Sequence, residues 1–170
     1  MSLIQGITAF TNELQKNNIS FGIIGGFAVF AYGGERTTFD IDFLIDGKHK
    51  EKIKEISLKM GLKVINENIE VLQLSGSAQI DIIFARREKT KLMLNNLRKI
   101  DSFPYPTVSP EDLIGLKIQA FTADRSREFT DKGDILTIFR NCSDLNIDKI
   151  KEYADIFNVW SEILDLKNRI

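Results

Sequence analysis

The chain has 170 residues, of which 43% are hydrophobic and 28% charged, values that are ordinary for a globular domain large enough to bury a core. The formal net charge of −1 provides no overall basic field of the kind that attracts nucleic acid, although a local basic patch would not show in the total. The single cysteine, Cys142, excludes an internal disulfide and a cysteine-based zinc site.

The first segment, residues 2–17, is expected to form an amphipathic helix that packs on a sheet. Its apolar residues recur at helical spacing, and Ser2 and Gln5 stand in the positions of a capping box. Polar residues interrupt the apolar pattern, so we expect neither a signal peptide nor a membrane span. The sequence therefore predicts a cytoplasmic protein without a membrane partner.

Residues 21–45 carry the most informative pattern in the chain. An apolar run meets the pair Gly25-Gly26, a short apolar segment follows to residue 32, and a second apolar run covers residues 39–45. This order predicts a strand, a glycine turn, a helix and a strand. Glycine lets the backbone come close to a ligand, and free N–H groups at a helix start bind phosphate oxygens. The turn is therefore a candidate phosphate site.

Two carboxylates, Asp40 and Asp42, interrupt the second of these strands. Side chains alternate along a strand, so both carboxylates lie on one face, whereas the apolar residues of 39–45 lie mainly on the other. Ionised carboxylates near the centre of a sheet must be paired or bound to a cation, and this pair suits magnesium and phosphate chemistry. The alternative is a chance arrangement in a surface strand.

The strand expected at 79–85 repeats this pattern with one carboxylate, Asp81. Before it the sequence predicts a helix over 48–60 and short strands over 62–65 and 69–74. If the strands of Asp40 and Asp81 are neighbours, three carboxylates converge. The alternative is an aspartate in water on an edge strand.

The remaining chain is expected to be mainly helical. A weak helical pattern over 89–100 leads to an extended proline-rich linker over 103–106, and Ser109 and Pro110 mark a strong helix start. Residues 130–134 resemble the cap of a following helix, which would place Asp131 and Asp134 in its first turn. Residues 146–170 are expected to form one last amphipathic helix.

One lysine, Lys117, falls near the centre of the apolar face of the helix that begins at residue 110. A lysine directed at the protein interior needs an anionic partner or a ligand. From the residues alone, the partner would be Asp124, Asp81 or Asp134.

Upstream, Arg36 could hold a phosphate, orient Asp40 or be an ordinary surface arginine.

The segments Ile24-Gly25-Gly26 and Arg36-Thr37-Thr38-Phe39-Asp40-Ile41-Asp42 resemble the signature of the polymerase-β-like nucleotidyltransferase superfamily, in particular the small branch that includes AbiEii-type toxins. The resemblance implies that Asp40, Asp42 and Asp81 are catalytic and bind metal, with Asp81 helping to deprotonate the attacking hydroxyl. It implies that the nucleotide is bound by further residues of this chain: Gly25, Gly26, Arg36, Thr38 and Lys117.

The fold class expected is α/β (α+β), a small mixed β-sheet flanked by helices with a helical C-terminal half. The predicted domains are a nucleotidyltransferase core over 1–103 and a helical part over 104–170, packed on that core in one compact unit. The implied cofactors are two Mg²⁺ ions, with Mn²⁺ as an alternative, and the implied substrate is an NTP such as ATP.

The reaction implied is transfer of a nucleoside monophosphate to a hydroxyl of a tRNA or a small molecule. The resemblance also suggests a toxin-like component with a cognate antitoxin-like protein, and a homodimer is a further expected partner state. The alternative is an inactive nucleotide- or partner-binding module. The pattern assigns no role to four further arginines: Arg86, Arg87, Arg125 and Arg127.

Overall fold

The computed structural model describes residues 3–170 and divides the chain into two compact units. The sheet unit comprises Met1–Phe27 and Thr37–Val108, and the helical unit comprises Ala28–Arg36 and Ser109–Ile170. Ser2, one half of the predicted capping box, lies outside the described residues. Among the residues described, no helix is long and apolar enough to cross a membrane.

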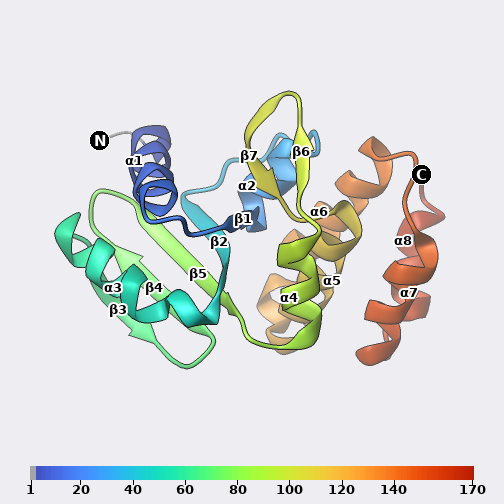
Figure 1. Cartoon of the computed structure of the whole chain (residues 1–170). Helices are drawn as coiled ribbons and strands as arrows, with labels where there is room; N and C mark the ends of the chain where they lie inside the picture. Colours follow the sequence, from blue (N-terminus) through green and yellow to red (C-terminus); the bar gives the residue numbers. More distant parts are fainter. Residues whose placement is uncertain (1–2) are drawn as a thin grey trace. The chain divides into compact units, whose positions relative to one another are not determined.

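The sheet unit contains a mixed sheet of seven strands (Figure 1). In chain order these are β1 (Phe21–Ile24), β2 (Asp40–Asp46), β3 (Lys63–Glu67), β4 (Val71–Ser75), β5 (Gln79–Ala85), β6 (Arg98–Ile100) and β7 (Phe103–Thr107). Their spatial order is β3-β4-β5-β2-β1-β7-β6. β2 and β5 lie side by side and are parallel, and β1 is antiparallel to β2.

Helices of the same unit pack against this sheet. The helical elements are α1 (Leu3–Lys16), the start of α2 (Gly25–Ala31), η1 (Gly47–His49), α3 (Lys50–Lys59) and α4 (Glu88–Asn95). Phe10 of α1 packs against Phe43 of β2 with ring centroids 5.2 Å apart. Ile41 and Ile45 are also buried, as alternation predicts, but Phe39 precedes the strand and is 79% exposed.

The sheet extends further than the sequence indicates, because the proline-rich segment is a strand. β7 contains Pro104 and Pro106, yet its register pairs with β6 involve residues that keep their N–H groups, Phe103 and Thr107. Proline is tolerated in a strand where its missing N–H is not needed by the ladder. The helix expected over 89–100 ends at Asn95, and β6 occupies the remainder.

The helical unit contains α5 (Pro110–Ala123), η2 (Arg125–Arg127), α6 (Glu128–Asn141), α7 (Ile147–Ile156) and α8 (Trp160–Lys167). Ser109 caps α5 as predicted, since its hydroxyl accepts the Asp112 N–H at 3.2 Å. α6 begins at Glu128, before the predicted cap, which puts Asp131 in the first turn but Asp134 beyond it. The predicted fold class, a mixed sheet with flanking helices and a helical C-terminal half, is confirmed.

The segment predicted to form one last helix, residues 146–170, forms two helices, α7 and α8, because the chain turns between them. Asn158 has φ of 55°, and the Val159 N–H donates to the Ala154 carbonyl at 3.0 Å. Asparagine adopts this left-handed conformation more readily than other side chains and often ends a helix. After the turn Ile163 is buried, whereas the next residue, Leu164, is 37% exposed.

Candidate functional site

Three carboxylates converge on one face of the sheet unit. Asp42 and Asp81 are register partners on the parallel strands β2 and β5, and Asp40 lies two residues before Asp42. Each of the three half-buried side chains offers one oxygen, and these oxygens all lie within 4.8 Å of one another. The neighbouring strands that the sequence argument required are therefore present.

This donor set has the chemistry of a site for a hard divalent cation. Carboxylate oxygens are the ligands that Mg²⁺ and Mn²⁺ prefer, and Mg²⁺ commonly uses few protein carboxylates together with substrate phosphates. Three like charges at this spacing also repel one another unless a cation lies between them. The residues fit a metal-assisted phosphate chemistry on both counts.

Gly25 makes room for one of these carboxylates. Its φ is +65°, and a Cβ built there would lie 1.9 Å from Asp42 Oδ2. No side chain fits in that space, and the left-handed conformation disfavours one independently. The sequence indicated a phosphate role for Gly25 and Gly26, which stays a prediction, but it did not reveal this steric reason for the first glycine.

Thr38 orients the first carboxylate. Its hydroxyl donates to Asp40 Oδ1 at 2.7 Å, and both residues lie in the sheet unit. A hydrogen bond to an ionised carboxylate is short and stronger than one between neutral groups. This contact shows that Thr38 holds the Asp40 carboxylate by a hydrogen bond. It does not test the nucleotide-binding role predicted for Thr38, which stays a prediction.

Two amide side chains beside Asp81 were missed by the sequence argument. Gln73 of β4 is the register partner of Asp81, and its Nε2 donates to Asp81 Oδ2 at 3.0 Å. Asn66 of β3 in turn donates from Nδ2 to Gln73 Oε1 at 2.9 Å. In the sequence, Gln73 is a polar residue between two leucines, Leu72 and Leu74, which are buried in the structure. This pattern could have indicated a role only if β4 had been known to lie beside β5.

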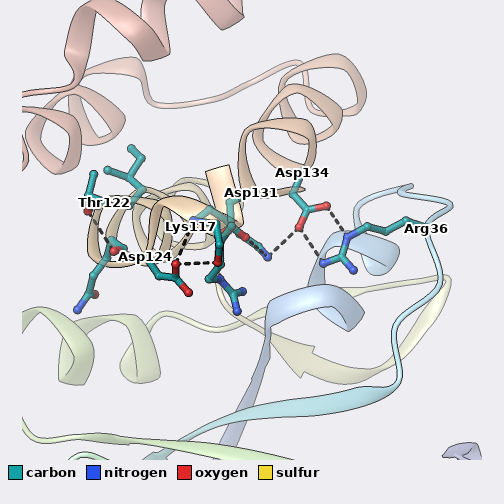
Figure 2. Close-up of polar contacts among 10 residues, drawn as sticks. Arg36, Lys117, Thr122, Asp124, Asp131 and Asp134 are labelled. Carbon is teal, nitrogen blue, oxygen red and sulfur yellow. Dashed lines mark hydrogen bonds and ion pairs between the residues drawn. The ribbon is translucent and has the colours of Figure 1, made fainter. Parts of the chain in front are cut away.

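Arg36 and Lys117 belong to a charged cluster inside the helical unit (Figure 2). Arg36 donates from Nε to Asp134 Oδ1 at 2.7 Å and from its guanidinium to Asp134 Oδ2 at 2.9 Å. Lys117 is 4% exposed, and its Nζ lies 2.7 Å from Asp134 Oδ2 and 3.0 Å from Asp131 Oδ1. Arg127 completes the cluster with a contact of 3.1 Å to Asp131.

Two opposing effects act on the pKa of Asp134. Burial raises the pKa of this carboxyl, but the Arg36 hydrogen bond and the charge of Lys117 outweigh burial and hold the pKa below its ordinary value. The ion pair between Lys117 and Asp134 was one alternative from the sequence, whereas Asp131 was not considered as a partner. Asp124 instead caps η2 by accepting the Ser126 N–H at 3.0 Å. The nucleotide-binding roles of Lys117 and Arg36 stay predictions.

The other arginines without an assigned role have local partners. Arg86 donates to the backbone carbonyls of Ile69 at 2.8 Å and Gly47 at 3.1 Å. Arg87 forms two hydrogen bonds with Glu70, at 2.7 and 2.9 Å. Arg125 lies 3.5 Å from Glu128, a long contact in an exposed position.

No protein-family model matches the chain, and no curated protein matches it either. Among solved structures, the solution structure of the antibiotic-resistance factor ANT(2'')-Ia has a TM-score of 0.67 at 17% identity, covering 96% of this chain and 95% of that one. The lincosamide antibiotic adenylyltransferase LnuA has a TM-score of 0.58 at 16% identity, covering 79% of this chain and 94% of that one.

A nucleotidyltransferase-like protein from Paracoccidioides brasiliensis has a TM-score of 0.59 at 16% identity, covering 95% of this chain and 89% of that one. At these identities the likeness concerns the fold. The AbiEii-type branch stays a prediction from the sequence motif. The chain therefore has a nucleotidyltransferase-like fold, with three carboxylates gathered on its central strands.

Proposed function

We propose that this chain is a metal-dependent nucleotidyltransferase that moves a nucleoside monophosphate from an NTP to a hydroxyl acceptor. The observation that supports it most is the convergence of Asp40, Asp42 and Asp81 within 4.8 Å on two parallel strands. The fold is shared with nucleotidyltransferases, and Gly25 leaves the space that the Asp42 carboxylate occupies.

In the proposed reaction the acceptor oxygen forms a bond to the α-phosphorus, and the bond from that phosphorus to the bridging oxygen breaks, so that pyrophosphate leaves. Asp81 accepts the hydroxyl proton. Asp40 and Asp42 would hold two Mg²⁺ ions, or Mn²⁺, and Asp81 would hold one of them. The ions, when bound, supply Lewis-acid stabilisation of the charge on the phosphoryl group.

The nucleotide would be held by backbone and cationic groups. Gly25 and Gly26 would contact the triphosphate through their N–H groups, and Thr38, which donates to Asp40, would lie next to the nucleotide. Arg36 and Lys117 are proposed to neutralise phosphate charge. Both already contact Asp134, so their role toward the nucleotide requires a direct test.

The acceptor proposed first is a small molecule with a hydroxyl group. A structure of ANT(2'')-Ia contains adenylyl-2''-tobramycin and has a TM-score of 0.67 at 18% identity, and the LnuA structure contains lincomycin. A tRNA is the second candidate, although the net charge of −1 provides no general attraction to a polyanion. Turnover of labelled NTP with aminoglycosides, lincosamides or tRNA distinguishes these acceptors.

The experiment that tests the function is calorimetric titration of the full chain with each of the four NTPs, with Mg²⁺ and with chelator. We expect binding of at least one NTP that depends on Mg²⁺ and is lost in Asp42→Asn. Asp46→Asn is the matched control, because Asp46 lies on the same strand and face but outside the triad, and it should bind as the wild type does.

Absence of binding for every NTP would contradict the proposal and favour the inactive partner-binding module. A toxin role is tested separately by inducing the wild type and Asp42→Asn in bacteria, where growth arrest should require Asp42. Co-purification of a neighbouring gene product would test for an antitoxin, and light scattering would test for a homodimer.

A further inference from the structure

Four strands contribute one residue each to a single row across the sheet. The register pairs Asn66 of β3 with Gln73 of β4, Gln73 with Asp81 of β5, and Asp81 with Asp42 of β2. Two of the proposed metal ligands thus stand at one end of the row, and two neutral amides stand at the other. Cross-strand neighbours of this kind have side chains close enough to interact directly.

The amides are hydrogen-bonded in one direction, toward the carboxylates. Asn66 Nδ2 donates to Gln73 Oε1 at 2.9 Å, and Gln73 Nε2 donates to Asp81 Oδ2 at 3.0 Å. An amide has a donor end and an acceptor end, and an ionised carboxylate can only accept, so Asp81 requires the donor end of Gln73. The donor from Asn66 satisfies the opposite, acceptor end of Gln73 and supports this orientation.

We propose that Gln73 is a positioning residue for Asp81 and that Asn66 supports this orientation of the Gln73 amide; this inference rests on the proposed function. The hydrogen bond holds one Asp81 oxygen and limits rotation of the carboxylate, which prepares it to bind a cation. Carboxylates that bind metals are commonly held by such outer hydrogen bonds, and their removal lowers metal affinity.

The neutrality of the amide is part of this role. A lysine or arginine at residue 73 would also hold Asp81, but its charge would compete with the cation for the carboxylate. A glutamine supplies the donor without cancelling the negative charge of the triad. This distinguishes the Gln73 contact from the ion pairs elsewhere in the chain, where every buried carboxylate of the Lys117 cluster meets a cationic group.

The test measures Mn²⁺ affinity of the full chain by electron paramagnetic resonance of free Mn²⁺, independently of turnover. Gln73→Leu keeps the volume but removes the donor, and we expect an affinity loss of about ten-fold, within the range observed when outer hydrogen bonds to metal ligands are removed. Ser75→Val, two residues along the same half-buried face of β4, is the matched control and should bind Mn²⁺ as the wild type does.

A second variant competes for the amide without deleting it. In Asn66→Asp the new carboxylate can only accept, so it competes with Asp81 for the Gln73 Nε2 donor. An added negative charge alone would strengthen Mn²⁺ binding, whereas loss of the donor from Asp81 weakens it. We expect Asn66→Asp to bind Mn²⁺ several-fold more weakly than Asn66→Ala. In the Gln73→Leu background, where only the added charge remains, this order should reverse.

The outcomes separate this inference from the proposed function. If the wild type and Asp42→Asn both fail to bind Mn²⁺, the proposed function and the inference are both overturned. If the wild type binds, Asp42→Asn does not, and Gln73→Leu equals the wild type, only the inference is overturned. A lower unfolding temperature of Gln73→Leu with unchanged Mn²⁺ affinity would likewise reduce Gln73 to a structural residue.

Discussion

The ionised state of Asp134 depends on its partners rather than on water. The carboxyl is 3% exposed, and an isolated buried charge would be strongly unfavourable. Arg36 and Lys117 both reach it, at 2.7 Å each. Removing one member of such a buried pair leaves the other members without compensation, so single substitutions in this cluster should be costly.

The first prediction at this scale concerns pH. The pKa of Asp134 is lowered from its ordinary 3.8, with burial opposing the shift and Arg36 and Lys117 producing it. The unfolded state then takes up a proton before the folded state does, so the stabilisation is complete above the ordinary pKa and is lost as pH falls through the folded one. Urea unfolding of the wild type and Asp134→Asn should differ by about 3 kcal/mol at pH 7 and converge at lower pH. A gap independent of pH would contradict this.

A second prediction concerns Lys117→Met. The substitution leaves Asp131 with Arg127 and Asp134 with Arg36, both partly exposed partners, so we expect a stability loss of about 3 kcal/mol. Thermal unfolding and NTP titration should be measured on the same samples. Preserved stability with lost NTP binding would instead indicate that the lysine acts mainly on phosphate.

The individual site residues differ in how far the sequence could reveal them. Period-two alternation sufficed to place Asp40 and Asp42 on one face, and the apolar surroundings of Asp81 indicated the same orientation. Gln73 could not be found this way, because its role depends on the identity of the neighbouring strand. The ion pairs of Lys117 with Asp131 and Asp134 likewise depend on how α5 and α6 pack, which no local sequence pattern encodes.

At the scale of elements, the turn from β1 into α2 is defined by a single glycine. Gly25→Ala introduces a Cβ 1.9 Å from Asp42 Oδ2 in a left-handed conformation, so we expect it to displace Asp42, to lower the unfolding temperature and to abolish Mg²⁺-dependent NTP binding. Gly133→Ala in α6 is the matched control. A Cβ there meets nothing within 4 Å, and the helix should gain about 0.5–1 kcal/mol. Equal effects of the two substitutions in thermal unfolding would contradict the steric argument.

The junction between α7 and α8 gives a second prediction at this scale. Asn158 has φ of 55°, so Asn158→Ala should cost about 1 kcal/mol, whereas Asn158→Gly should be neutral or stabilising. Denaturant midpoints of the two variants give the comparison. If both variants lost equal stability, the asparagine side chain itself, rather than its backbone conformation, would be the stabilising element.

Elements with strong periodicity and end signals could be predicted, and those defined by tertiary pairing could not. The start of α5 follows from Ser109 and Pro110, which act locally. β7 follows from pairing with β1 and β6, and its prolines argue against a strand when the segment is considered alone. No glycine marks the end of α7 after Ile156, and apolar residues continue at helical spacing beyond it. The sequence therefore predicted one helix where the structure has two.

At the scale of the whole molecule, the chain passes between the two units three times. Residues 28–36 belong to the helical unit, although the sheet unit continues at Thr37. Arg36 is therefore joined to Thr38 and Asp40 through one short stretch of backbone, while its side chain is held by Asp134. Within the charged cluster Arg36 is close in the sequence to the carboxylate strand β2, so substitutions of Arg36 and of its partner Asp134 are best assayed by nucleotide binding as well as by stability.

The metal site should also affect the stability of the whole chain, with opposite signs in the absence and presence of metal. In chelator, the three carboxylates within 4.8 Å repel one another, so Asp42→Asn should stabilise the protein by about 1 kcal/mol. With Mn²⁺ at a hundred times its Kd, the wild type should gain about 2.7 kcal/mol, which the variant should not.

Thermal unfolding of both proteins in chelator and in Mn²⁺ measures this reversal of order. Asp46→Asn keeps a side-chain oxygen that can accept the Lys48 N–H, which Asp46 accepts at 2.9 Å, so its stability relative to the wild type should be the same in both conditions. If Asp42→Asn were less stable than the wild type in chelator, Asp42 would be a structural residue of the sheet. If Asp42→Asn is more stable than the wild type in chelator but less stable in Mn²⁺, and Asp46→Asn shows no such reversal, the three carboxylates destabilise the metal-free fold and stabilise it when a cation is bound.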